Sequence, residues 1–353
     1  MAGYKIGFVG TTAPHSFMFL DTLRLIPDTA ASIALVETDP ARIAKAAADE
    51  VYPDLDSMLS EAKPDICFVM VPTSEVEAPA IRCAEAGLPL VIDKHVANTS
   101  DGIRRIMAAC EANGVKMTTG YTWRYSPVVQ QMRQWVADGV LGKVFCFDIR
   151  MVTTSAEVRT QDPQFAWLFE RERSGGGILI WLGCHFVDMV RFILGREVVA
   201  VSAITSRLTE VKSDVEDVAS VSLLLDDGSV GSLHCSYVMP GGMSSAYDTS
   251  FAIWGSGGDV SWAPALGGQN PTLRIRSAHP DWARSPERTV QYQDKLVPKA
   301  YGGTQLAVDY FRDMIHRLVA GEDHIVTGDD ALKVVEICEG AYRSAETGQR
   351  VEL

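Results

Sequence analysis

The sequence lacks the features that mark disulfide-bonded, zinc-binding and membrane-spanning proteins. Its seven cysteines are scattered and odd in number, with no CxxC pair, which favours reduced thiols in a cytoplasm over a disulfide framework or a zinc site. No segment approaches the roughly 18 uninterrupted apolar residues that span a bilayer, and the N-terminus shows no secretory pattern. We therefore predict a cytoplasmic protein with no metal site and no membrane partner.

Basic residues are also scarce. Lys and Arg number 32 against 45 Asp and Glu, which gives a net charge of −13. Such an acidic surface repels nucleic-acid phosphates and anionic lipid, so we expect a small-molecule ligand and no nucleic acid. The length of 353 residues is enough for two domains that each bury a core.

Short apolar strands alternate with helical segments in residues 1–123. This order is typical of a doubly wound parallel sheet, the Rossmann architecture, with helices on both faces. We predict a dinucleotide-binding domain over 1–123. Its expected strands are Tyr4–Val9, Ile33–Val36, Ile66–Val71, Leu90–Ile92 and Lys116–Thr119.

The loop after the first strand only partly matches the GxGxxG fingerprint of dinucleotide-binding proteins. Gly10 fits, but Thr12 and His15 occupy the other two glycine positions. Thr11, Thr12 and Ser16 can still hydrogen-bond a pyrophosphate at the start of the following helix, where the helix dipole favours an anion. The alternative is an ordinary polar turn with a helix cap.

Further polar residues follow the other strands, at the sheet edge where ligands bind. Glu37 and Thr38 end the second strand with no arginine beside them, which favours the free ribose of NAD over the 2′-phosphate of NADP; the alternative is a strand cap. Asp93 and Lys94 end the fourth strand, where a lysine is well placed to meet a ligand, or else reaches back to water. The same edge carries Pro72, Thr73 and Tyr121, and we predict that these residues bind the cofactor together with Gly10, His15, Asp93 and Lys94.

The pattern changes after residue 123 to long strands of alternating polarity. Asp226–Ser229 is a hairpin signal between two of them. We predict an α+β domain over 124–353 with a large, mostly antiparallel open sheet. Helices cover one face, and a second subunit is a plausible cover for the rest, as in a homodimer or homotetramer. The expected strands are 143–153, 198–208, 218–225, 230–238, 249–254, 273–276 and 289–292.

Three glycines, Gly175–Gly177, lead into an apolar helix that carries His185. Backbone without side chains lets a ligand approach closely. A lone histidine on an apolar helix can equally be a satisfied core residue.

In combination, four segments resemble the Gfo/Idh/MocA family of NAD(P)-dependent oxidoreductases. Ala86–His95 is similar to the family's AGxxVxxEKP segment, with Asp93 for Glu and His95 for Pro. Gly120–Pro127 is similar to GxxxRFxP, Ser174–Asp188 to GGGxxxDxGxHxxD, and Tyr342–Gly348 to the closing helix.

The resemblance implies hydride transfer from a secondary alcohol of a sugar or cyclitol to NAD. Lys94 would hydrogen-bond the reacting oxygen, and His185 would accept the hydroxyl proton. Apart from the resemblance, we predict that Tyr121, Trp123 and Trp181 line the substrate, with Tyr237 and Tyr301 as further candidates. The alternative, equally open for Tyr121, Trp123, Tyr237 and Tyr301, is that these aromatic residues belong to the ordinary core.

One departure from the family pattern concerns the histidine's neighbour. Trp181 replaces the aspartate that the family carries four residues before the histidine, and Asp188 is an alternative partner for the ring. Two other functions stay open: a redox-neutral enzyme that oxidises a carbon transiently, and a non-catalytic NAD- and sugar-binding regulator.

Overall fold

A computed structural model describes residues 3–241, 247–263, 272–293 and 295–353. The contacts divide the chain into two compact units. The first comprises the chain up to Thr122 with Pro163–Gly175 and Lys295–Lys333, and the second comprises the remainder. The first segment of the first unit ends at Thr122, next to the predicted domain boundary at 123. The same unit also includes two segments from later in the chain. The predicted division into 1–123 and 124–353 stays a prediction.

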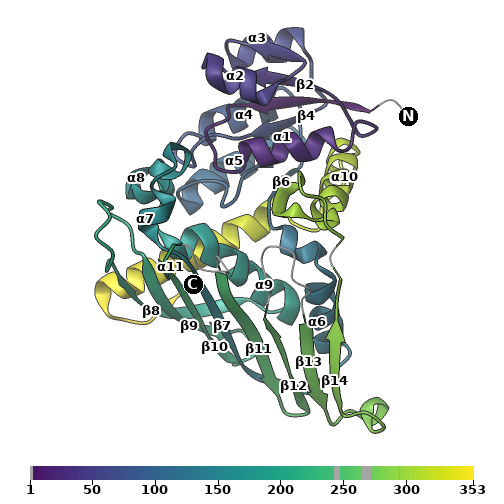
Figure 1. Cartoon of the computed structure of the whole chain (residues 1–353), viewed down its shortest axis with the longest axis vertical. Coiled ribbons are helices and arrows are strands. Elements are labelled where there is room, and N and C mark those ends of the chain that lie inside the picture. Colours follow the sequence, from purple (N-terminus) through teal and green to yellow (C-terminus); the bar gives the residue numbers. More distant parts are fainter. Residues whose placement is uncertain (1–2, 242–246, 264–271, 294) are drawn as a thin grey trace. The chain divides into compact units, whose positions relative to one another are not determined.

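The first unit is built around a six-stranded parallel sheet with the order β3-β2-β1-β4-β5-β6. Strands β2, β4 and β6 of this sheet are labelled in Figure 1. The predicted doubly wound sheet is therefore confirmed, and its strand order reverses direction between β1 and β4, the point where such sheets bind ligands. The prediction missed β3. The strands are β1 Tyr4–Val9, β2 Ala30–Val36, β3 Glu50–Tyr52, β4 Ile66–Val69, β5 Leu90–Ile92 and β6 Met117–Thr119.

Local signals set the helices of this unit. Asp39 caps α2 by accepting hydrogen bonds from two backbone N–H groups, and Pro40 occupies its first turn. Helix α1 packs against α10, and α4 packs against α5. The helices are α1 Ser16–Arg24, α2 Pro40–Ala46, α3 Leu55–Glu61, α4 Glu77–Glu85, α5 Ser100–Ala112, η2 Pro163–Phe169, α8 Arg171–Ser174, η5 Tyr301–Gly303 and α10 Gln305–Val319.

The second unit contains a nine-stranded sheet with the order β14-β13-β12-β11-β7-β10-β9-β8-β15. Its strands pair antiparallel except for β7 and β10, which confirms a mostly antiparallel sheet. The Asp226–Ser229 hairpin forms, while β12 and β15 were not predicted. The strands are β7 Val144–Thr154, β8 Val198–Ser206, β9 Val218–Leu225, β10 Val230–Met239, β11 Tyr247–Gly255, β12 Gly258–Ala263, β13 Thr272–Ser277, β14 Glu287–Gln291 and β15 Val351–Glu352.

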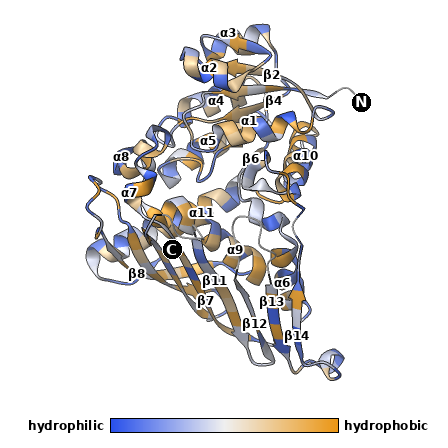
Figure 2. Cartoon of the chain, viewed as in Figure 1, coloured by the Kyte–Doolittle hydropathy of each residue, from blue (hydrophilic) through white to orange (hydrophobic). Residues whose placement is uncertain are grey.

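Both hydrophobic and hydrophilic residues occur along the strands of this sheet (Figure 2). Because neighbouring side chains in a strand point to opposite faces, the two faces of the sheet differ. In β9, for example, Ala219, Val221, Leu223 and Leu225 are buried, whereas Ser220 and Ser222 are exposed. Helices α6 and α9 pack together within this unit. Its remaining helices are η1 Thr122–Tyr125, α6 Pro127–Ala137, α7 Ala156–Arg159, η3 Leu179–Gly183, α9 Cys184–Leu194, η4 Pro280–Trp282 and α11 Gly328–Thr347, of which η1 and α11 each begin in the first unit.

One stretch, Arg171–Leu194, is long and apolar enough to cross a membrane by length and composition. However, 94% of its apolar window is buried inside the protein, which is typical of a core helix.

Candidate active site

The loop after β1 needs its single glycine. Gly10 has a φ of +74°, and a Cβ there would lie 2.5 Å from Val71 Cγ1, so a side chain is excluded on both counts. The Ser16 hydroxyl donates to the Ala13 carbonyl at 2.7 Å, and the Thr12 carbonyl accepts from the Trp167 indole at 3.2 Å. The distant segment η2 therefore holds this loop, which the sequence did not predict.

Glu37 at the end of β2 is already engaged by its neighbours. Its Oε2 accepts from the Thr11 hydroxyl at 2.5 Å, and its Oε1 accepts from the backbone N–H groups of Thr38 and Asp39. A carboxylate offers about four acceptor positions, so about one remains for a ribose hydroxyl. The Arg42 guanidinium donates to the Thr11 carbonyl at 2.8 Å, so an arginine lies near this site although none is adjacent in sequence.

His15 and Asp93, both predicted to bind cofactor, contact each other. His15 Nδ1 lies 2.9 Å from Asp93 Oδ1, and the Lys94 backbone N–H donates to the same oxygen at 2.8 Å. Burial favours the neutral acid, but the His15 ring and the Lys94 charge outweigh it, so the pKa of Asp93 is below its ordinary value. Lys94 itself is 1% exposed. The pair links the loop after β1 to the segment that carries Lys94.

His95, which replaces the family's proline, fastens a later segment to the sheet edge. Its Nε2 lies 2.8 Å from the Ser174 carbonyl, and the Thr73 hydroxyl donates to the Arg173 carbonyl at 2.8 Å. Burial, reinforced by the Lys94 charge, lowers the pKa of His95 to about 3, so the ring is neutral and can donate to the carbonyl. Thr73, a predicted cofactor residue, thus also serves the protein's own structure, as does Pro72, whose carbonyl accepts from the Glu75 N–H.

In the second unit, Trp181 and His185 lie on consecutive helical segments. Trp181 belongs to η3, a π-helix, and His185 to α9, which follows directly. Single turns of π-helix are rare in proteins overall, and those that occur are often found at functional sites. Trp181 is 2% exposed and His185 is 8% exposed. The Asp188 carboxylate is bound on two sides by the Arg124 guanidinium, at 2.6 and 3.0 Å. Asp188 and Arg124 therefore form a buried, bidentate ion pair.

The glycines before this helix are required by the protein's own packing. A Cβ on Gly175 would lie 2.5 Å from the Asn98 carbonyl oxygen, one on Gly176 would lie 2.1 Å from Tyr342 Oη, and one on Gly177 would lie 1.9 Å from the Glu216 carbonyl oxygen. Close contact with these residues is enough to account for the three glycines. No pattern in the sequence pointed to Glu216.

The predicted aromatic residues are divided between the units. Tyr121 is fully buried in the first unit, and Tyr301 lies there too, with its ring 5.1 Å from that of His15. In the second unit, Trp123 packs edge-on against Trp262, and the Arg159 guanidinium lies over the ring of the buried Tyr237. The part of the chain that the structure describes contains no group of three His, Cys, Asp or Glu side chains suited to a metal ion.

Two family models match most of the chain. Residues 4–121 match the model described as the oxidoreductase family with an NAD-binding Rossmann fold. Residues 129–261 match the model of the GFO/IDH/MocA C-terminal domain. The two models describe the N-terminal and C-terminal domains of one family, and they match this chain in that order.

Curated relatives and a solved structure extend this match over nearly the whole chain. D-apiose dehydrogenase of Paraburkholderia graminis is 27% identical over 92% of this chain and 84% of its own length. Inositol 2-dehydrogenase of Rhizobium meliloti is 24% identical over 85% of this chain and 84% of its own. An oxidoreductase from Agrobacterium radiobacter, solved with NAD⁺, L-tartaric acid and magnesium, superimposes with a TM-score of 0.83 at 20% identity over 99% of this chain and 98% of its own, which shows the fold alone.

Proposed function

Because the chain belongs to the Gfo/Idh/MocA family of NAD-binding oxidoreductases, we propose that it oxidises a secondary alcohol of a sugar or cyclitol. The support for this substrate class is that the similar proteins include dehydrogenases of D-apiose and inositol. NAD, when bound, supplies the hydride acceptor.

The residues at the carboxyl end of the parallel sheet fit a dinucleotide. The backbone at Gly10 leaves no room for a side chain, and helix α1 begins with His15 at its N-cap without a side-chain capping bond. Such a helix start suits a pyrophosphate. Glu37 retains about one acceptor position for a ribose hydroxyl. We therefore assign Gly10–Ser16, Glu37 and Thr38 to cofactor binding, with Pro72, Thr73, Asp93, Lys94 and Tyr121 lining the same edge.

The observation that carries the catalytic assignment is the burial of Lys94 at the end of β5, where its charge helps to lower the pKa of Asp93. Held there, Lys94 would donate to the reacting oxygen and stabilise the negative charge that develops on it. His185 would accept the hydroxyl proton, since an imidazole exchanges a proton near neutral pH. Trp181, which replaces a carboxylate, would offer a flat apolar surface to a sugar ring.

The test is oxidation of a panel of pentoses, hexoses and cyclitols with NAD, followed by NADH absorbance. Steady NADH production with at least one substrate is expected. Turnover of a sugar without formation of NADH would instead favour the redox-neutral alternative. This alternative is tested because Trp181 replaces the family's aspartate. Sugar binding without turnover would favour a regulator. Trp181→Asp is a second probe, because a gain of activity on simple cyclitols would mark the tryptophan as a specificity residue.

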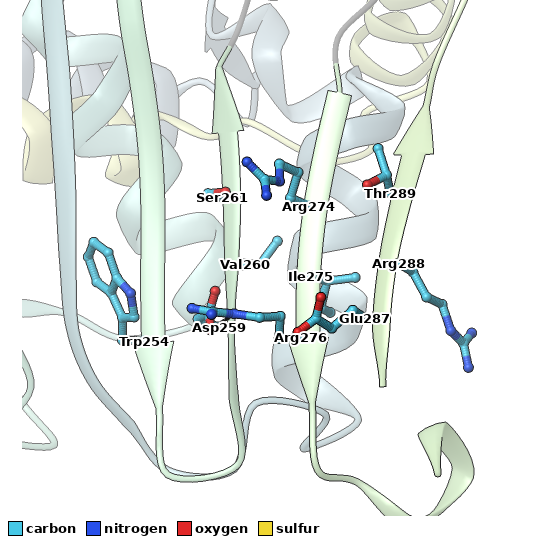
Figure 3. A pocket seen from close by; sticks show the side chains of 10 residues that line it. All are labelled: Trp254, Asp259, Val260, Ser261, Arg274, Ile275, Arg276, Glu287, Arg288 and Thr289. Atoms are coloured by element: carbon cyan, nitrogen blue, oxygen red, sulfur yellow. Dashed lines mark hydrogen bonds and ion pairs between the residues drawn. The ribbon is translucent and has the colours of Figure 1, made fainter. Parts of the chain in front are cut away.

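We also propose that the exposed face of the nine-stranded sheet joins copies of this chain. Paired positions form a row across it, in which Val230, Cys146 and Trp254 are followed by the charges of Asp259, Arg276 and Glu287. The charged end of this row lines a pocket of about 550 Å³. Figure 3 shows the side chains that line it. Trp254 is 40% exposed and Val230 is 50% exposed. Apolar side chains beside alternating charges suit a self-complementary interface.

Analytical ultracentrifugation of the wild type and Trp254→Lys tests this proposal. A dimer or tetramer that dissociates in the variant is expected, and a monomeric wild type would contradict it.

A further inference from the structure

The helix that carries Trp181 and His185 begins at a point set by two distant residues. The first backbone N–H groups of any helix have no partner within it and need acceptors from elsewhere. Here those groups belong to residues 177–180, and the first bond inside the helix runs from the Trp181 N–H to the Gly177 carbonyl at 3.0 Å.

Glu216 and Tyr342 supply acceptors for all four groups. Glu216 Oε2 accepts from the Gly177 N–H at 2.8 Å, and its Oε1 accepts from the Leu179 N–H at 2.9 Å. The Glu216 carbonyl accepts from the Ile178 N–H at 3.2 Å. The Tyr342 hydroxyl accepts from the Ile180 N–H at 3.2 Å and donates to Glu216 Oε1 at 2.9 Å.

Tyr342 and Glu216 also pack directly against Gly176 and Gly177. A Cβ on Gly176 would meet the Tyr342 hydroxyl, and one on Gly177 would meet the Glu216 carbonyl, as described above. Burial raises the pKa of Glu216 although the backbone N–H groups oppose this shift. The helix dipole favours a negative charge at this end. Position and hydrogen bonding therefore both tie the helix start to this pair.

We propose that Glu216 and Tyr342 are positioning residues that fix the first turn of this helix and thereby the placement of Trp181 and His185. The inference rests on the proposed role of His185. His185 lies about two turns beyond Gly177, so a helix that starts at a different residue rotates and shifts the imidazole. A displacement of about 1 Å in a reacting group can cost on the order of 10²-fold in rate.

The neighbouring residue provides a matched control. Asp217 is also a buried carboxylate that accepts from backbone N–H groups, at 2.9 Å from Leu208 and 2.7 Å from Thr209. Its bonds hold a loop that follows β8 and do not involve the helix start. A loss of activity caused by weakening any buried carboxylate would therefore appear in Asp217→Asn as well.

The experiment compares Glu216→Gln, Tyr342→Phe and Asp217→Asn with the wild type. Gln keeps one acceptor oxygen of the two, and Phe removes the hydroxyl that serves Ile180. We expect kcat for the best alcohol substrate to fall about 10-fold or more in the first two variants. The pH profile of kcat should shift, the dissociation constant for NAD should not change, and amide hydrogen exchange should accelerate in 177–185. Asp217→Asn should keep the wild-type kcat.

The inference is overturned if Glu216→Gln and Tyr342→Phe both fold and keep the wild-type kcat and pH profile, or if Asp217→Asn loses as much activity as they do. The exchange measurement needs no substrate. If the wild type oxidises no alcohol, the proposed function fails, while faster exchange in 177–185 alone would still show that the pair fixes the helix start. Unchanged exchange in both variants would overturn the structural part as well.

Discussion

Lys94 and His185 are held in place in two different ways. Lys94 follows a strand directly, and its immediate neighbours Asp93 and His95 attach the same turn to the loop after β1 and to Ser174. His185 lies inside a helix whose first turn is hydrogen-bonded by Glu216 and Tyr342. Both residues come much later in the sequence than His185. Lys94 is therefore held through its two immediate neighbours, which bond to the distant residues His15 and Ser174. The helix that carries His185 is held at its first turn instead, by the residues that cap it.

Replacing Lys94 tests the strand-end side of this comparison with the largest expected effect. Lys94→Ala should lower kcat by a factor on the order of 10² or more, because a fixed donor to the developing negative charge is lost. Lys116→Ala, at an exposed ion pair with Asp323 in the same unit, is the control and should keep its activity. Steady-state kinetics of both variants measure the difference. Normal turnover in Lys94→Ala would remove this lysine from the mechanism.

Replacing His185 tests the helix side. His185→Ala should lower kcat and flatten its pH dependence near neutrality, because the group that accepts the proton is gone. The matched control is His234→Ala, since His234 is an exposed histidine on β10. A pH–rate profile of each variant is the measurement. A profile for His185→Ala that keeps the wild-type shape would assign proton transfer to another residue.

Filling the glycine turn tests how closely the helix cap fits. Gly177→Ala places a methyl group against the Glu216 carbonyl, so we expect a loss of about 1–3 kcal/mol of stability, the usual range for overpacking. In Gly120→Ala the nearest atom to the new methyl group is 3.6 Å away, so this control should melt close to the wild type. Thermal unfolding followed by circular dichroism compares the two. Equal melting temperatures would contradict the packing described here.

Replacing Glu37 tests the cofactor preference. Glu37→Ala should weaken NAD binding, because a ribose acceptor is lost, and should relax discrimination against NADP, because a negative charge is removed. The presence of Arg42 at the Thr11 carbonyl strengthens the second expectation. Fluorescence titration with both cofactors, with the exposed Glu111→Ala as control, gives the ratio of dissociation constants. An unchanged ratio would place the preference elsewhere.

The smallest effect concerns His95. Its pKa is about 3 in the folded protein against an ordinary value of 6.5, so the unfolded chain binds a proton that the folded protein does not. The stability from this group is therefore complete above pH 6.5 and is lost progressively as the pH falls from 6.5 towards 3. His95→Asn keeps a side-chain donor and cannot titrate, so its stability should fall less between pH 6.5 and 5. Urea unfolding at several pH values measures this, and parallel curves for both proteins would exclude a contribution from His95.

Much of the fold could be predicted from the sequence because its signals are local. Apolar strands, the Asp226–Ser229 turn and the residues after each strand identified both sheets and the edge that carries Lys94. The strands that were missed are short, like β3 and β15, or carry charged and polar residues, like β12. The parallel pairing of β7 with β10 joins strands far apart in the chain, and no local pattern specifies it.

The parts of the candidate site that could not be predicted all depend on contacts over long stretches of chain. Arg42 reaches Thr11 because α2 follows β2 beside the loop, and Trp167 reaches Thr12 across more than a hundred residues. His15 and Asp93 were both recognised, but each was assigned to cofactor rather than to the other. Polar residues at a sheet edge predict where ligands bind. They do not predict which of these residues form hydrogen bonds with one another instead of with the ligand.

The tight fit of Gly176 and Gly177 has a consequence for how this scaffold can change its chemistry. Both positions face the protein's own carbonyl and hydroxyl groups, so no exchange there can enlarge, reshape or recharge a binding surface without disturbing the fold. Changes in what is recognised therefore have to arise from side chains elsewhere than at these two glycines.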